Sequence, residues 1–242
     1  MESRPYPPYV SRFAVVMFDL DGTLVDHEGA ARQGVIQWLT ACELATEQQC
    51  NERLAALWDE VAERHFPAFR TGEITFQEQR RRRLREFLPH VGLAAENIDD
   101  AALDGRFEDY VKHYEAAWRA YDDVLPGLRS LSGTRLAVLS NGDQAQQEDK
   151  LRRTGLDVHF EDVMTSSGLG VGKPSPAAFL RACARLKADP STVMYVGDSI
   201  EVDAQAATAA GLVGVWLDRH VRSNAYHQPT IATLEELPRL VG

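Results

Sequence analysis

Four short apolar runs, each ending abruptly in small or acidic residues, constrain the fold of this 242-residue chain more than any other feature. They are residues 13–18, 135–139, 192–196 and 214–217. Continuous apolar runs of this length are typical of strands that are buried on both faces of a parallel sheet. The pattern therefore predicts an α/β fold in which helices cover both faces of the sheet.

Segments with a helical pattern lie between the later runs. They are residues 144–154, 174–187 and 203–210, and Gly155 and Gly211 stand where the first and last of them end. Strands that alternate with helices of about 10–14 residues indicate βαβ units. We therefore predict a doubly wound, Rossmann-like parallel sheet.

Residues 28–118 depart from this alternation because no convincing apolar strand occurs among them. Instead, apolar residues recur at three- and four-residue spacing, as in the stripe formed by Leu103, Phe107, Tyr110, Val111, Tyr114 and Trp118. We predict that residues 28–118 form an all-helical cap domain. It would be inserted into a discontinuous core domain formed by residues 1–27 and 119–242. Two short crossings would let such a domain hinge as a lid.

Four polar clusters are expected at the carboxyl ends of the strands, where open parallel sheets bind their ligands. The first is the sequence from Asp19 to Leu24, in which Asp19 and Asp21 lie two residues apart and Gly22 permits a sharp turn. Two close carboxylates repel each other unless a cation or a proton accompanies them. Taken alone, the same residues could equally form an ordinary turn at a strand end.

Each of the other three clusters also has a purely structural alternative. Ser140, Asn141 and Gly142 could hold an anionic oxygen or form a turn. Lys173, just before a predicted helix, could neutralise a phosphoryl group or be a solvated surface residue. Asp198 ends a predicted buried strand, where a divalent cation is a natural partner. Asp203 could be no more than the N-cap of the next helix.

Taken together and in this order, the four motifs resemble those of the haloacid dehalogenase (HAD) superfamily over nearly the whole chain. The resemblance implies that Asp19 is the nucleophile and that Asp21 is the general acid and base. It also implies that Ser140, the amide of Asn141 and Lys173 bind the phosphoryl oxygens. Phosphoryl transfer requires such an in-line nucleophile and groups that offset charge on the equatorial oxygens.

The same resemblance implies a Mg²⁺ cofactor. The side chains of Asp19 and Asp198 and the backbone carbonyl of Asp21 would hold the ion, and Asp203 would support the metal shell. Mg²⁺ prefers one or two carboxylates together with phosphate and water. The expected protein is a Mg²⁺-dependent phosphatase that hydrolyses small phosphorylated metabolites through an aspartyl-phosphate intermediate.

Alternatives remain within the same fold. A haloacid dehalogenase is disfavoured by Asp21, because halide leaves without a proton whereas an alkoxide needs one. A sugar-phosphate mutase uses the same residues and stays open, and a catalytically silent binding module is a third alternative. Residues 80–83, all arginine, together with Arg85 form either a solvated helix surface or a contact to a second anionic group on the substrate.

Composition excludes some classes of partner. A net charge of −10 disfavours binding to a nucleic-acid polymer, and no apolar run is long enough to span a membrane. The three cysteines contain no CxxC pair, which predicts reduced thiols in a cytoplasmic protein. The sequence indicates no oligomeric state.

Overall fold

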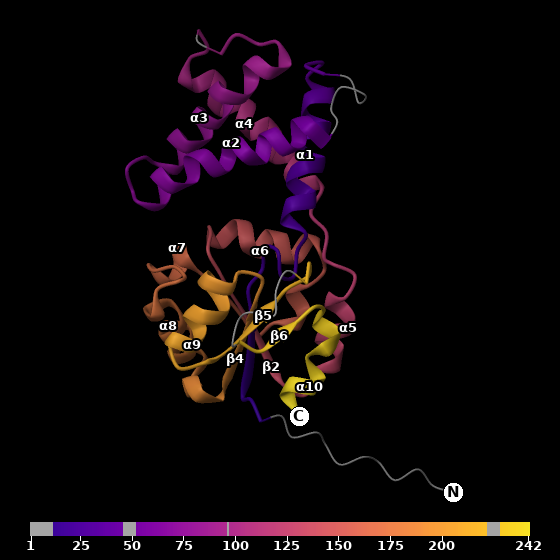
Figure 1. Ribbon diagram of the computed structural model, residues 1–242, viewed down its shortest axis with the longest axis vertical. Helices are drawn as coiled ribbons and strands as arrows, with labels where there is room; N and C mark the ends of the chain where they lie inside the picture. Colours follow the sequence, from indigo (N-terminus) through magenta and orange to yellow (C-terminus); the bar gives the residue numbers. More distant parts are fainter. Residues whose placement is uncertain (1–11, 46–51, 96, 222–227) are drawn as a thin grey trace, which may run out of the picture. The chain divides into compact units, whose positions relative to one another are not determined.

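The computed structural model describes residues 12–45, 52–95, 97–221 and 228–242, and the chain forms two compact units (Figure 1). One unit runs up to Asp26 and resumes at Arg119, whereas the other is His27–Trp118. Each unit has a hydrophobic core of its own. The first unit is an α/β structure and the second contains only helices among its described residues.

The α/β unit is built on one sheet in which all described pairings are parallel, which confirms the predicted doubly wound fold. The strand order is β3-β2-β1-β4-β5-β6. The strands are β1 (Val15–Phe18), β2 (Arg135–Ser140), β3 (Asp162–Thr165), β4 (Val193–Gly197), β5 (Val213–Leu217) and β6 (Thr230–Ile231). The two edge strands were not predicted, because β3 begins with a half-buried aspartate and β6 has two residues.

Helices connect these strands and cover both faces of the sheet. The α-helices are α5 (Val124–Ser130), α6 (Gln144–Arg153), α7 (Ser166–Leu169), α8 (Pro176–Leu186), α9 (Ala206–Ala209) and α10 (Pro238–Val241). Short 3₁₀ turns occur at η2 (Asp157–His159), η3 (Pro190–Thr192) and η5 (Leu234–Glu236), and η4 (Ile200–Gln205) is a π-helix. The helix predicted over residues 203–210 therefore begins earlier, at Ile200, and as a π-turn.

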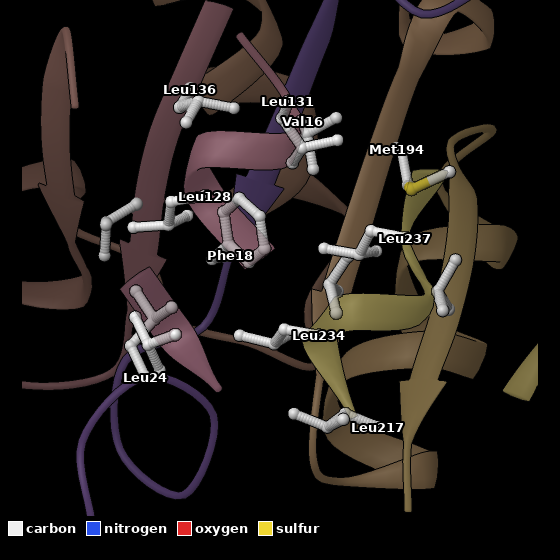
Figure 2. Packing of buried hydrophobic residues seen from close by; sticks show 14 of the residues in the cluster. Val16, Phe18, Leu24, Leu128, Leu131, Leu136, Met194, Leu217, Leu234 and Leu237 are labelled. Carbon is white, nitrogen blue, oxygen red and sulfur yellow. The ribbon is translucent and has the colours of Figure 1, made fainter. Parts of the chain in front are cut away.

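Successive side chains of β1 point to opposite faces of the sheet, so the core of the α/β unit has two layers. Val16 and Phe18 pack into the cluster that includes residues of α5 and α10, and Figure 2 shows this layer. Val15 and Met17 point to the opposite face and pack with residues of α8 and α9. Successive side chains of a strand point to opposite faces, so a strand that is apolar at every position must be covered twice. In Figure 1, α8 and α9 lie on one side of the sheet and α5 and α10 on the other.

The helical unit comprises α1 (His27–Ala41), α2 (Glu52–Arg70), α3 (Phe76–Phe87), η1 (Leu88–Val91) and α4 (Asp100–Ala116). Trp58 lies at the centre of its core, with ring centroids 4.6 Å from Tyr110 and 4.9 Å from Phe87. Such aromatic side chains bury about 150–250 Å² each and dominate the energetics of a small core. Thr75 and Asp99 cap α3 and α4 by accepting hydrogen bonds from backbone amides.

The two points where the chain leaves and re-enters the α/β unit lie side by side. The amide of Asp26 donates to the carbonyl of Arg119 at 3.0 Å, and Arg119 Nη2 donates to Asp26 Oδ2 at 2.7 Å. Val25 and Ala120 also form an antiparallel bridge. Paired crossings of this kind define a short, two-stranded connection.

In the part of the chain that the structure describes, no helix is long and apolar enough to cross a membrane.

Candidate active site

The register of the three central strands brings the predicted site residues to one edge of the sheet. Phe18 pairs with Val138 on one side and with Val196 on the other. The chain segments that follow these three residues therefore start at the same edge, as expected for a parallel sheet. The structure accordingly brings Asp19, Ser140 and Asp198 to this edge.

The turn after β1 is shaped by Gly22. Its backbone has a φ of +83°, and its amide donates to the carbonyl of Val25 at 2.9 Å. A Cβ atom at this position would lie 2.7 Å from Cγ of Asp198. Only glycine adopts this conformation readily and leaves room for the Asp198 carboxylate. The segment after β1 therefore does form a turn, as the alternative predicted. An ordinary turn, however, would not need to leave room for the Asp198 carboxylate.

Lys173 is a buried lysine with a complete set of hydrogen bonds. Its Nζ donates to Asp19 Oδ1 at 2.6 Å, to Asp203 Oδ1 at 2.7 Å and to the Tyr195 hydroxyl at 2.7 Å. An ammonium group has three N–H donors, so all three are used. Burial lowers the pKa of Lys173, but the carboxylates of Asp19 and Asp203 outweigh it and raise that pKa above its usual value. The alternative of a solvated surface lysine is wrong, because Lys173 is 7% exposed.

Lys173 does not directly follow a strand, contrary to the prediction that all four clusters stand at strand ends. It lies in the loop between α7 and α8. The side chain of Asn141 fixes this loop, since Asn141 Oδ1 accepts from the amide of Lys173 at 2.9 Å and Nδ2 donates to its carbonyl at 2.8 Å. Asn141 thus positions Lys173 in addition to the phosphoryl contact predicted for its backbone amide.

Three carboxylates lie close together, and two of them, Asp19 and Asp203, contact the Lys173 ammonium. One oxygen from each of Asp19, Asp198 and Asp203 lies within 4.8 Å of the other two. Burial, together with repulsion from the other two carboxylates, raises the pKa of Asp19 well above its usual value against the opposing effect of Lys173. The Asp198 carboxylate reaches solvent, yet desolvation by the surrounding protein and repulsion from Asp203 raise its pKa to about 6. The negative charge of the three carboxylates is therefore only partly offset by the Lys173 ammonium.

Asp203 is not the N-cap of the following helix, because that position belongs to Ser199. Instead, the buried Asp203 carboxylate accepts from Lys173 through Oδ1 and from the amide of Ser199 through Oδ2 at 3.0 Å. It lies in the first turn of the π-helix, which carries it back under the end of β4. Asp203 therefore supports the cluster from inside the protein.

Asp21 is linked to the phosphate-binding candidate Ser140 by Gln147 and is paired with Lys150, two residues that the sequence did not point out. Gln147 Nε2 donates to Asp21 Oδ2 at 3.0 Å and to the buried Ser140 hydroxyl at 3.1 Å. Lys150 Nζ donates to Asp21 Oδ1 at 2.6 Å. Both residues come from α6, where Leu151 marks the buried side but the polar Gln147 and Lys150 are typical of a solvated surface.

Tyr195 is the third functional residue that the sequence did not point out. Its hydroxyl accepts from Lys173 and donates to the carbonyl of Leu139 at 2.8 Å. Burial, together with repulsion from the carboxylates of Asp203 and Asp19, raises the pKa of Tyr195 well above its usual value, so the hydroxyl stays protonated. The signal was available, since a phenol inside an otherwise apolar strand needs a hydrogen-bond partner.

The arginine-rich segment of the helical unit is divided between surface and core. Three of its side chains pair with carboxylates of the same unit, namely Arg81 with Asp100 and Asp104, Arg82 with Glu78, and Arg85 with Asp100. Arg80 and Arg83 stack on aromatic rings instead, at 4.2 Å from the Phe76 centroid and 3.8 Å from the Trp58 centroid. A solvated surface is thus the wrong interpretation for Arg83, which is 8% exposed.

Known proteins place this chain in a family. Glyceraldehyde 3-phosphate phosphatase of Methanopyrus kandleri is 29% identical over 209 residues, which cover 84% of this chain and 83% of that protein. N-acylneuraminate-9-phosphatase of Homo sapiens is 26% identical over 241 residues, which cover 96% and 95%. The solved 2-haloacid dehalogenase of Pseudomonas syringae pv. Tomato has 29% identity and a TM-score of 0.64, with 94% and 97% covered.

A sequence profile of the haloacid dehalogenase-like hydrolases matches residues 13–211, a segment that contains every residue of the site described above. Because this match extends over most of the chain, the protein belongs to the haloacid dehalogenase-like hydrolase family.

Proposed function

We propose that this protein is a Mg²⁺-dependent phosphatase that hydrolyses small phosphate monoesters through an aspartyl-phosphate at Asp19. The observation that carries the proposal is a pair of carboxylates with different surroundings. Asp19 is buried against the Lys173 ammonium, whereas Asp21 is partly exposed and accepts from Lys150 and from Gln147, which also holds the Ser140 hydroxyl. Two carboxylates held in different environments can take the separate roles of nucleophile and general acid.

The acidic cluster fits a hard divalent cation. Three carboxylates and one ammonium leave two negative charges, if all four groups are ionised. Carboxylate and carbonyl oxygens are the ligands that Mg²⁺ prefers. Asp19 and Asp198 would hold the ion through their side chains and Asp21 through its backbone carbonyl. Asp203 would support the shell, since its oxygens already bind Lys173 and Ser199. Bound Mg²⁺ would offset charge on the phosphoryl oxygens.

The first half of the reaction forms the covalent intermediate. A carboxylate oxygen of Asp19 attacks phosphorus, and the bond from phosphorus to the ester oxygen breaks. Asp21 donates a proton to that oxygen, so the alcohol leaves neutral. The Ser140 hydroxyl and the amide of Asn141 bind the remaining phosphoryl oxygens. The Lys173 ammonium offsets their charge, and it donates to one of them by giving up one of its three hydrogen bonds within the protein. Donors that are held in place before substrate arrives are the condition for electrostatic catalysis.

The second half regenerates the enzyme. Asp21, now ionised, takes a proton from water, and the water oxygen attacks the phosphorus of the aspartyl-phosphate. The bond between phosphorus and Asp19 breaks and inorganic phosphate leaves. Covalent catalysis of this kind replaces one difficult displacement with two easier ones.

Asp21 separates this proposal from dehalogenation, which needs no proton donor for the leaving halide. The solved relative named as a 2-haloacid dehalogenase makes halide release a necessary control. The phosphatases among the relatives are named for different phosphorylated compounds, which supports a small phosphorylated metabolite as substrate class and no single compound. We also propose that the helical unit acts as a cap, because the paired crossings at Asp26 and Arg119 suit a hinge.

The proposal is tested by replacing the nucleophile with its isostere. Asp19→Asn should lower Mg²⁺-dependent release of phosphate from 4-nitrophenyl phosphate by about 1000-fold or more, because the amide cannot form the covalent intermediate. Asp149→Asn is the matched control and should retain wild-type activity, because this half-buried carboxylate of α6 pairs with Arg152 and Arg153 and not with the residues of the site. The fold of both variants is checked by circular dichroism.

Four other outcomes would redirect the assignment. Wild-type turnover in Asp19→Asn would refute the covalent mechanism. Interconversion of sugar phosphates without free phosphate would indicate a mutase, and halide release from 2-haloacids would indicate a dehalogenase. Absence of any Mg²⁺-dependent turnover over a panel of phosphorylated metabolites would favour a binding module.

A further inference from the structure

Helix α6 buries a polar face, although nothing in its sequence marks it as part of the site. Gln147 and Lys150 are both buried, three residues apart on the same side of the helix. We propose that Lys150 is a positioning residue that, together with Gln147, holds the Asp21 carboxylate beside the Ser140 hydroxyl. This inference rests on the proposed function, since it assigns Lys150 a role through the general acid.

The ion pair between Lys150 and Asp21 differs from an ordinary surface pair. Lys150 is 1% exposed, and its Nζ lies 2.6 Å from Asp21 Oδ1. Removing an ammonium group from water is costly unless a carboxylate compensates it. Surface pairs gain little because water competes for both partners. Lys150 therefore exerts a strong and directional attraction on one oxygen of Asp21.

Gln147 engages the second oxygen. Its Nε2 donates to Asp21 Oδ2 at 3.0 Å, while Lys150 engages Oδ1. Two donors on different oxygens fix the plane of a carboxylate as well as its position. The same Nε2 also reaches the Ser140 hydroxyl at 3.1 Å. Gln147 thus links Asp21, the proposed general acid, to Ser140, which is proposed to bind the phosphoryl oxygens.

Helix α6 is itself held firmly at its N-terminus. Asp143 accepts from the amide of Gln146 and caps the helix directly after the Ser140–Gly142 segment. The side chain of Gln144 donates to the carbonyl of Val163 at 2.9 Å and accepts from the Thr165 hydroxyl at 2.8 Å. The helix is therefore anchored to β3, and the donors that it presents to Asp21 stand on a rigid element, as precise positioning requires.

The chemical consequence depends on the leaving group. An alkoxide needs a well-placed proton donor, whereas 4-nitrophenolate leaves almost unaided. A residue that positions Asp21 should therefore matter for alkyl phosphates and much less for 4-nitrophenyl phosphate. Because kcat/KM reports the steps up to formation of the aspartyl-phosphate, it isolates the role of Asp21 as an acid.

The experiment compares Lys150→Met with wild type on both esters. We expect kcat/KM for a simple alkyl phosphate, such as glycerol 1-phosphate, to fall about 10- to 100-fold, a share of what a general acid contributes. For 4-nitrophenyl phosphate we expect a fall of about threefold or less. Lys112→Met, which removes an exposed lysine from α4, is the matched control and should leave both values unchanged.

A double-mutant cycle tests whether Lys150 acts through Asp21. On an Asp21→Asn background, Lys150→Met should cause no further loss, because the carboxylate that it positions is already absent. Equal falls on both esters, additive losses in the cycle, or a faster Lys150→Met enzyme would overturn the inference. If Lys150→Met fails to fold, Lys150→Gln takes its place, because a neutral side chain loses the attraction to Asp21 Oδ1 and leaves the contact between Gln147 and Ser140 intact; it should show the same dependence on the leaving group.

Failure of the inference and failure of the proposed function give different results. If Asp21→Asn retains wild-type activity on the alkyl ester, the proposed role of Asp21 as general acid fails. If Asp21→Asn is impaired and Lys150→Met is not, only the positioning role of Lys150 fails.

Discussion

Replacement of Tyr195 with phenylalanine removes a single oxygen atom from the centre of the α/β unit. That oxygen accepts from Lys173 Nζ at 2.7 Å and donates to the carbonyl of Leu139 at 2.8 Å. The ring, which packs edge-on against Phe179 at 5.0 Å, would be unchanged. The substitution therefore isolates the hydrogen bonds from the packing.

The expected cost follows from the groups that lose a partner. One N–H of the buried ammonium and the acceptor site on Leu139 would lose their hydrogen bonds, and each such group costs about 1–3 kcal/mol. Phenylalanine has no hydroxyl to remove from water on folding, and the absence of that desolvation penalty offsets part of this cost. We therefore expect the free energy of unfolding to fall by about 2–3 kcal/mol, equivalent to about 4–12 °C in Tm for a chain of this size.

The measurement is urea denaturation followed by circular dichroism, with thermal unfolding as a second readout. Tyr114→Phe is the matched control, because its hydroxyl contacts His27 at 2.8 Å in a partly buried place. There we expect a loss below about 1 kcal/mol. A loss below about 0.5 kcal/mol in Tyr195→Phe would show that Lys173 does not depend on this hydroxyl, and would refute the reasoning.

Two further predictions concern Gly22 and Asp123. In Gly22→Ala the new Cβ would displace the Asp198 carboxylate, so the Mg²⁺ concentration for half-maximal activity should rise about tenfold or more. Gly72→Ala has a similar positive φ and no atom within 4 Å, so an equal effect there would contradict the steric explanation. Asp123 is partly buried, which opposes ionisation, but hydrogen bonds from Arg219 and its neighbours lower its pKa below the usual value. Its stabilisation is therefore complete above the unfolded pKa of about 3.9 and is lost as pH falls through the lower folded value. We expect Asp123→Asn to cost about 1–3 kcal/mol at pH 7, and this difference to shrink below pH of about 4 in urea titrations. A constant difference across that range would contradict the ion pair with Arg219.

The four inner strands of the sheet and the motif residues were predictable from the sequence because their signals are local. An apolar run followed by aspartate shows both the strand and its functional end within about eight residues. Asp19 and Asp198 are therefore found along the chain without knowledge of their neighbours, and Lys173 is found from its own short motif just before a helix. The aspartate that closes the cluster, Asp203, was assigned a supporting role, but the alternative of a helix N-cap could be removed only when the structure placed Ser199 there.

The residues that orient these groups were not predictable, because their roles depend on contacts between distant segments. Lys150 and Asp21 are 129 positions apart, and Lys173 and Asp19 are 154 apart. Helix α6 is mostly polar, and Leu151 indicates which side faces the protein but not that Gln147 and Lys150 on that side contact Asp21. Only the packing of α6 against β3 turns Gln147 and Lys150 inward.

The arginines of α3 illustrate the same division. Their sequence predicts a charged helix surface, and the described ion pairs of Arg81, Arg82 and Arg85 agree with that. Arg83 differs because the helix rotation places it over Trp58, inside the core of the helical unit. The sequence alone determined which chemical groups this protein carries and which strand ends present them. The tertiary structure decided which charges are buried and what they contact, because burial is a property of packed elements and not of a residue in its own segment.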